Sequence, residues 1–140
     1  MYEKKVLSLG MAKKMAEAAI IKAKELTITI VVAILDDGGN LKYLARMDGT
    51  SFGSVRISQL KASTSASMPV SSRALGERNA KLPNGPYGGG AIPGIVLLGG
   101  GLPIITRDKQ HIGGIGISGA NPELDELCAQ AALDAVEDEL

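Results

Sequence analysis

Residues 28–47 read ITIVVAILDDGGNLKYLARM, and this stretch decides the class of fold. Ile28 to Leu35 is almost wholly apolar and rich in β-branched residues, which is typical of a strand covered on both faces. Residues 36–40 favour a tight turn, because aspartate, asparagine and glycine tolerate positive φ angles. Apolar and charged residues then alternate from Leu41 to Met47, as expected of a second strand. The stretch therefore predicts a β-hairpin whose first strand is central in a sheet.

Helical patterns lie on both sides of this hairpin. Apolar residues recur at three- and four-residue spacing over residues 8–26, which predicts an amphipathic helix capped by its first serine. A second helix is expected to begin at Ser51 or Ser54 and to end before Pro69. Its second half, residues 62–67, contains only Ala, Ser and Thr, and such small side chains allow another backbone to approach closely.

The second half of the chain predicts shorter elements. A third helix is expected over residues 71–81, followed by a loop rich in proline and glycine over residues 82–90. Three short strands are predicted at 95–98, 102–106 and 111–118, with the last two forming a second hairpin.

The chain ends in a helix that Asn121 and Pro122 open, with acidic residues in its first turn. Because the strands form hairpins and do not alternate with crossover helices, the sheet should be antiparallel. We therefore predict an α+β fold, with one antiparallel sheet of about five strands flanked by helices. Residues 1–140 are expected to form a single domain.

Composition excludes several classes of function. The 15 basic and 15 acidic residues give no net charge, so no basic field attracts nucleic acid or an anionic membrane. The apolar runs are too short to span a bilayer and the N-terminus lacks a signal-peptide core, which predicts a cytoplasmic protein. A single cysteine excludes an internal disulfide. A neutral surface rich in aliphatic residues and glycine favours homo-oligomers.

Two glycine patterns resemble nucleotide-binding loops. Gly99, Gly100 and Gly101 would let backbone N–H groups approach an anion, but no Walker lysine and no helix follow them. The glycines at 114, 116 and 119 have GxGxxG spacing, yet the residues between them, Ile115, Ile117 and Ser118, lie inside a predicted strand, and no βαβ unit surrounds the pattern. We interpret both patterns as turns, bulges or close backbone packing.

Four single residues have side chains that could serve a site. His111 is the only histidine, and its imidazole is a candidate iron ligand or general base, although it follows a charged turn and fits an exposed position there. Cys128 lies on the apolar stripe of the last helix, which favours core packing over catalysis. Met11 and Met15 are thioethers on the first helix, where packing is again favoured over haem ligation.

The densest group of charges comes from the first hairpin and the second helix. Arg46, Asp48 and Lys61, together with Asp36 and Asp37, are candidates for a pocket that binds an acidic ligand. In an enzyme, Asp48 would be the base and Arg46 a carboxylate clamp. Ordinary ion pairs explain the same residues, since no nucleophile with an adjacent base accompanies them.

Five separated segments together resemble the GlcG/HbpS-like haem-binding family, which includes the C-terminal domain of PduO-type corrinoid adenosyltransferases. In chain order they are VAILDDGG (32–39), LARMDG (44–49), KAST (61–64), LGGGLP (98–103) and IGGIGISG (112–119), followed by Asp125 and Glu126 at the start of the last helix. The resemblance covers nearly the whole chain. It implies a profilin-like sheet flanked by helices, and assembly into dimers or rings as large as octamers.

The resemblance also implies binding or degradation of haem, or a role beside glycolate, glycerol or propanediol metabolism. Some family members use a histidine of the first helix as axial ligand, and this chain has none there, so no axial ligand is carried over. In a protein that binds haem or a related tetrapyrrole such as a corrinoid, Arg46 and Lys61 would face the propionates and His111 the iron. The alternatives are an enzyme or accessory protein acting on a small acidic metabolite, and a structural oligomeric subunit.

Overall fold

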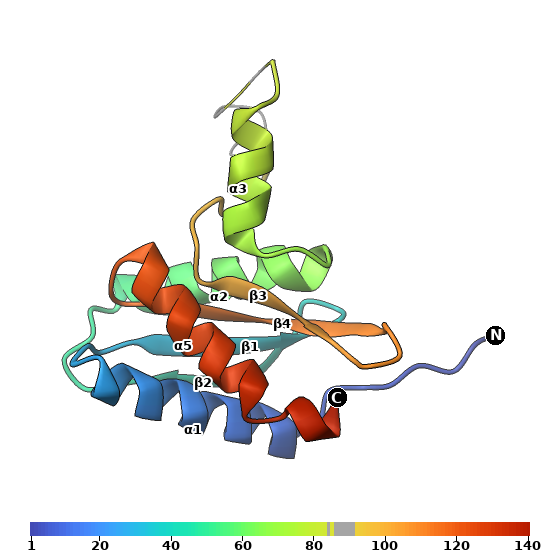
Figure 1. Cartoon of the computed structure of the whole chain (residues 1–140), viewed down its shortest axis with the longest axis horizontal. Coiled ribbons are helices and arrows are strands. Elements are labelled where there is room, and N and C mark those ends of the chain that lie inside the picture. Colours follow the sequence, from blue (N-terminus) through green and yellow to red (C-terminus); the bar gives the residue numbers. More distant parts are fainter. Residues whose placement is uncertain (84, 86–91) are drawn as a thin grey trace.

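The computed structural model describes residues 1–83, 85 and 92–140, and it consists of one sheet with helices on both faces (Figure 1). Among these residues, no helix is both long and apolar enough to cross a membrane. The elements in chain order are α1 (Leu9–Glu25), β1 (Val31–Asp36), β2 (Leu41–Arg46), α2 (Gly53–Ser67), α3 (Ser72–Ala80), β3 (Gly101–Ile105), β4 (His111–Ser118), α5 (Pro122–Asp134) and the short 3₁₀ helix η1 (Glu137–Glu139).

The described strands form one antiparallel sheet in the order β2-β1-β4-β3. Strand β1 is central, as predicted: Val31 pairs with Arg46 of β2 and with Ser118 of β4, and residues 31–35 are all buried. The predicted α+β class and the antiparallel sheet flanked by helices are confirmed, with four strands where about five were expected.

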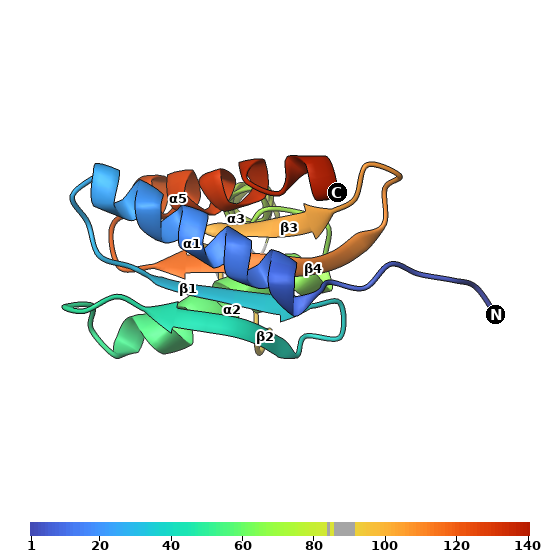
Figure 2. The same ribbon diagram turned by 90° about the horizontal axis from the view of Figure 1, so that it is seen from below.

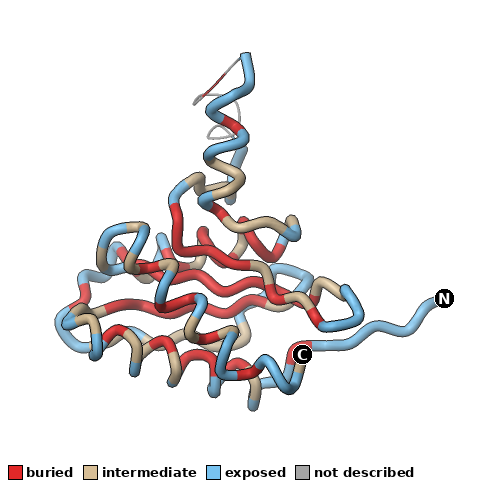
Figure 3. Tube along the Cα trace, viewed as in Figure 1, coloured by how far each residue is buried: buried red, intermediate tan, exposed pale blue. Residues whose placement is uncertain are grey.

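The helices form a layer on each face of the sheet. Helices α1 and α5 cover one face and α2 covers the other, while α3 projects away from the sheet on the α2 side (Figures 1 and 2). Strand β1 contributes to both cores, since Val32 and Ile34 pack in the cluster that includes α1 and α5, and Ala33 and Leu35 pack with α2. Figure 3 shows that burial is concentrated in the strands and in the helix faces turned toward them.

Side-chain caps begin three of the helices, where the N-terminal N–H groups lack partners within the helix. The Ser8 hydroxyl accepts a hydrogen bond from the Met11 amide, as predicted, and the Ser71 hydroxyl caps α3 in the same way. The Asn121 side chain caps α5, with Pro122 as the first helical residue. Helix α2 differs from the prediction, because Phe52 occupies its cap position and a preceding turn satisfies the first amides.

The glycines of β4 allow α2 to lie directly on the sheet. A Cβ at Gly114 would collide with the backbone of Ala62 and Ala66, and one at Gly116 would collide with the backbone of Ser58 and Ala62. Close backbone packing therefore accounts for these glycines, and the small side chains of α2 are the matching surface.

The predicted strand at residues 95–98 was wrong. The Val96 amide donates to the Thr64 hydroxyl at 2.9 Å, and the Leu98 carbonyl accepts from the Ser72 hydroxyl. Because side chains of α2 and α3 satisfy these backbone groups, the segment runs between the two helices and joins no strand.

Candidate functional site

The projecting helix α3 and the segment after the proline- and glycine-rich region enclose an apolar cleft of about 470 Å³, here called the α3 cleft. Gly76 brings the two walls together, since a Cβ at this position would overlap the carbonyl oxygen of Leu97. The described lining consists of Met68, Leu75, Arg78, Asn79, Leu82, Pro83, Gly85, Ile92, Ile95 and Leu97.

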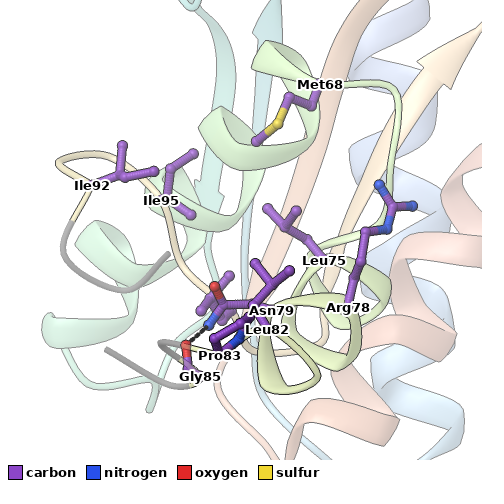
Figure 4. Close-up of a pocket in the computed structure, with 10 residues that line it drawn as sticks. Met68, Leu75, Arg78, Asn79, Leu82, Pro83, Gly85, Ile92 and Ile95 are labelled. Atoms are coloured by element: carbon purple, nitrogen blue, oxygen red, sulfur yellow. Dashed lines mark hydrogen bonds between the residues drawn. The ribbon is translucent and has the colours of Figure 1, made fainter. Parts of the chain in front are cut away.

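The chemistry of the α3 cleft is mostly that of aliphatic side chains. In Figure 4, Met68, Leu75 and Ile95 surround the space, with Arg78 on its α3 side. The buried Asn79 amide donates a hydrogen bond of 2.7 Å to the Gly85 carbonyl, so part of its hydrogen-bonding capacity serves the cleft wall. Such a lining suits a ligand with a large apolar surface.

Few of the described residues in the α3 cleft have a side chain that could coordinate iron. The Met68 thioether is a known type of haem ligand, and it is the one such group in the described lining. Elsewhere in the described residues, histidine, cysteine and carboxylate side chains form no group of three that could hold a metal ion.

Lys61 forms a buried ion pair with Asp125, a partner that was not grouped with it from the sequence. Its Nζ lies 3.0 Å from Asp125 Oδ2 and donates to the Ile117 carbonyl at 2.9 Å, and Lys61 is only 2% exposed. The other carboxylate oxygen of Asp125 accepts from the Ala120 amide at 3.0 Å. With its ammonium group enclosed in this way, Lys61 helps to join α2, β4 and α5.

The glycine triplet packs around this pair. A Cβ on Gly100 would lie 2.6 Å from the Ile117 carbonyl oxygen and 2.9 Å from Lys61 Nζ, and Gly100 has a φ of +120°. A Cβ on Gly101 would lie 2.5 Å from the Lys61 carbonyl oxygen. The triplet therefore serves backbone packing around a buried charge, and close backbone packing is one of the roles predicted for it from the sequence.

Arg46 and Asp48 lie at the end of β2 and are exposed. The Arg46 Nε donates to the Thr50 carbonyl at 2.8 Å, and its two terminal nitrogens have no partner among the described residues. Arg46 lies two strands away from Ile117, the β4 residue that Lys61 contacts, because β1 separates β2 from β4. The structure therefore keeps Arg46 and Asp48 near each other and places Lys61 apart from them.

Asp36 and Asp37 lie at the opposite end of the β1–β2 hairpin. The Asp36 carboxylate accepts from the backbone amides of Asn40 and Gly38, and these hydrogen bonds, with that of Asn40 the larger cause, hold its pKa below the ordinary range. Asp37 pairs with Lys4 at 2.6 Å. The two aspartates thus stabilise the turn and the N-terminal segment, and they do not join Arg46.

His111 begins β4, at the end of the sheet where Asp36 lies. Its Nε2 lies 2.8 Å from the Ser65 carbonyl oxygen, so this nitrogen carries the proton and donates. The ring is partly buried and does not line the α3 cleft. Along the strand direction, His111 and Arg46 are separated by about 23 Å, because Arg46 is level with Ser118 and His111 lies seven residues before Ser118 in β4.

The remaining candidates are core residues. Cys128 is fully buried, and burial together with the Asp125 carboxylate raises the pKa of its thiol to about 11. Met15 is fully buried in the same cluster, and Met11 packs against it. None of the three lines the α3 cleft.

Sequence reasoning missed the residues of the α3 cleft. Arg78 and Met68 belong to no sequence motif. Leu75 lies in α3, and the face of α3 that borders the cleft depends on the segment that packs against this helix. The one available signal was Gly76 inside a short helix, which marks a close approach of another backbone.

Comparison with known proteins identifies the family. The family model described as "Haem degrading protein HbpS-like" matches residues 7–134. An uncharacterized 15.0 kDa protein from the dhaT-dhaS intergenic region of Citrobacter freundii is 37% identical over 131 residues, covering 91% of this chain and 90% of that protein. This chain therefore belongs to the HbpS-like family, as the resemblance of its ordered segments indicated.

Solved structures agree with this assignment. The crystal structure of HbpS superposes with a TM-score of 0.87 at 31% identity, covering 97% of this chain and 94% of the other. The crystal structure of a PduOC–haem complex superposes with a TM-score of 0.82 at 30% identity, covering 94% and 95%. Haem binding is thus represented within the family and within this fold.

Proposed function

We propose that this protein binds haem or a related tetrapyrrole in the α3 cleft. The observation that carries the proposal is an apolar cleft of about 470 Å³ in a chain that superposes on a PduOC–haem complex. A tetrapyrrole has two broad apolar faces, and burying them against aliphatic side chains is favourable by about 25 cal/mol per Å². Leu75, Ile95 and Leu97 supply such a surface, while Met68 is the group in the described lining that would face the iron.

The polar candidates predicted from the sequence lie outside this cleft. Lys61 has its ammonium group enclosed, and His111 uses Nε2 for the Ser65 carbonyl. Arg46 and Asp48 stay predictions for a separate site that binds a small acid, because both are exposed and two nitrogens of Arg46 have no partner within the described part of the chain.

A haemin titration of the purified protein tests the proposal. We expect a shifted Soret band for the native chain, and at least about tenfold weaker binding for Leu75→Asp, which places a carboxylate in the apolar wall. The matched control is Leu127→Asp, since Leu127 is an exposed leucine of α5 outside the cleft. It should bind haemin like the native protein.

Thermal melts of both variants establish that they are folded. Absence of a Soret shift in the native protein would contradict the proposal. Equal affinity of Leu75→Asp and the native protein would place the ligand elsewhere.

We further propose that the protein acts in the cytoplasm as a homo-oligomer. Large apolar side chains stay exposed on several elements, among them Phe52 and Ile21, and a chain without net charge has little long-range repulsion between copies. Light scattering coupled to size exclusion should give a mass of at least two chains. A mass of one chain at micromolar concentration would contradict this proposal.

A further inference from the structure

Arg78 is the one charged side chain in the described lining of the α3 cleft. It is exposed, and among the described residues no carboxylate lies within ion-pair distance of its guanidinium. Arg73, five residues earlier in α3, differs in this respect, since it pairs with Glu77 and Glu126 at 3.1 Å. Glu77, the sequence neighbour of Arg78, is therefore engaged with another arginine.

The described part of the α3 cleft combines an apolar lining with one charged side chain, that of Arg78. Aliphatic side chains form the walls, and the Asn79 amide contributes a hydrogen bond to the Gly85 carbonyl. Arg78 lines the cleft and is exposed, so its guanidinium can contact both solvent and a molecule bound in the cleft. A guanidinium presents two parallel N–H donors that match the two oxygens of a carboxylate.

We propose that Arg78 recognises a carboxylate of the ligand, and this inference rests on the proposed binding of a tetrapyrrole in the α3 cleft. The cleft then selects molecules with a planar apolar body and a carboxylate at the edge. Haemin, whose edge bears two propionates, has this form. Its dimethyl ester has the same apolar body without the negative charge, so it lacks the group that Arg78 recognises.

Binding of haemin and of haemin dimethyl ester should be compared in three proteins. The native chain is expected to bind haemin at least about fivefold more tightly than the ester, the preference typical of one partly exposed, charge-assisted contact. Arg78→Met should lose this preference by binding haemin more weakly, while its affinity for the ester stays unchanged. Arg56→Met is the control, because Arg56 is an exposed arginine of α2 outside the cleft and has no ion pair in the described structure.

The ester distinguishes carboxylate recognition from a structural role. If Arg78→Met lost affinity for both ligands equally, Arg78 would be a packing residue and the inference would be wrong. Equal binding of haemin and ester by the native chain would also overturn it, while leaving tetrapyrrole binding intact. If the native chain bound neither ligand, the proposed function would fail and this inference with it.

Discussion

Replacing Gly116 with alanine should lower the free energy of unfolding by about 3 kcal/mol or more, at the upper end of what overpacking costs in protein cores. The added methyl group would collide with the Ser58 carbonyl oxygen and the Ala62 amide nitrogen. Both are backbone atoms of α2, so no side-chain rotation relieves the overlap. Relief requires α2 to move off the sheet, which would open its contacts with β4 and with Ala33 and Leu35 of the smaller core cluster.

Urea unfolding followed by circular dichroism measures this effect. Gly53→Ala is the matched control, because Gly53 begins α2 and a Cβ there would meet no atom within 4 Å. It should change stability by less than about 1 kcal/mol. Comparable stability of Gly116→Ala and Gly53→Ala would show that α2 does not rest on the backbone of β4.

The parts of the fold that could be predicted from the sequence are those set by local rules. The turn at residues 36–40 and the caps Ser8 and Asn121 depend on neighbours within a few residues, and the structure has them where the sequence placed them. The glycines of β4 were interpreted as turns, bulges or close backbone packing, and close packing against α2 is what the structure has at Gly114 and Gly116.

The predictions that failed concern residues whose partners are distant in the sequence. Residues 95–98 have the composition of a strand, but hydroxyl groups of Thr64 and Ser72 take their backbone hydrogen bonds. The α3 cleft is formed by two segments that only the fold brings together. Lys61 was grouped with the nearby Arg46, whereas its partner Asp125 lies 64 residues further along the chain.

Replacing Lys61 with methionine should destabilise the protein by about 3–5 kcal/mol, the usual cost of removing one partner of a buried ion pair. Methionine fills similar space but leaves the Asp125 carboxylate, which is 1% exposed, without its countercharge. The Ile117 carbonyl would also lose the hydrogen bond that Lys61 donates. The Ala120 amide still donates to Asp125, and one such bond does not compensate a buried charge.

Equilibrium unfolding of two further variants separates this effect from simple loss of a lysine. Lys14→Met breaks an exposed pair with Glu139, whose side chains are 59% and 40% exposed, and should cost less than about 1 kcal/mol. In the double variant Lys61→Met with Asp125→Asn, the buried charge is absent and the amide oxygen still accepts from the Ala120 amide. This double variant should therefore be more stable than Lys61→Met alone, by at least about 1 kcal/mol. A loss in Lys61→Met no larger than that in Lys14→Met would mean that water reaches the pair, and the role of the glycine triplet as its enclosure would have to be abandoned.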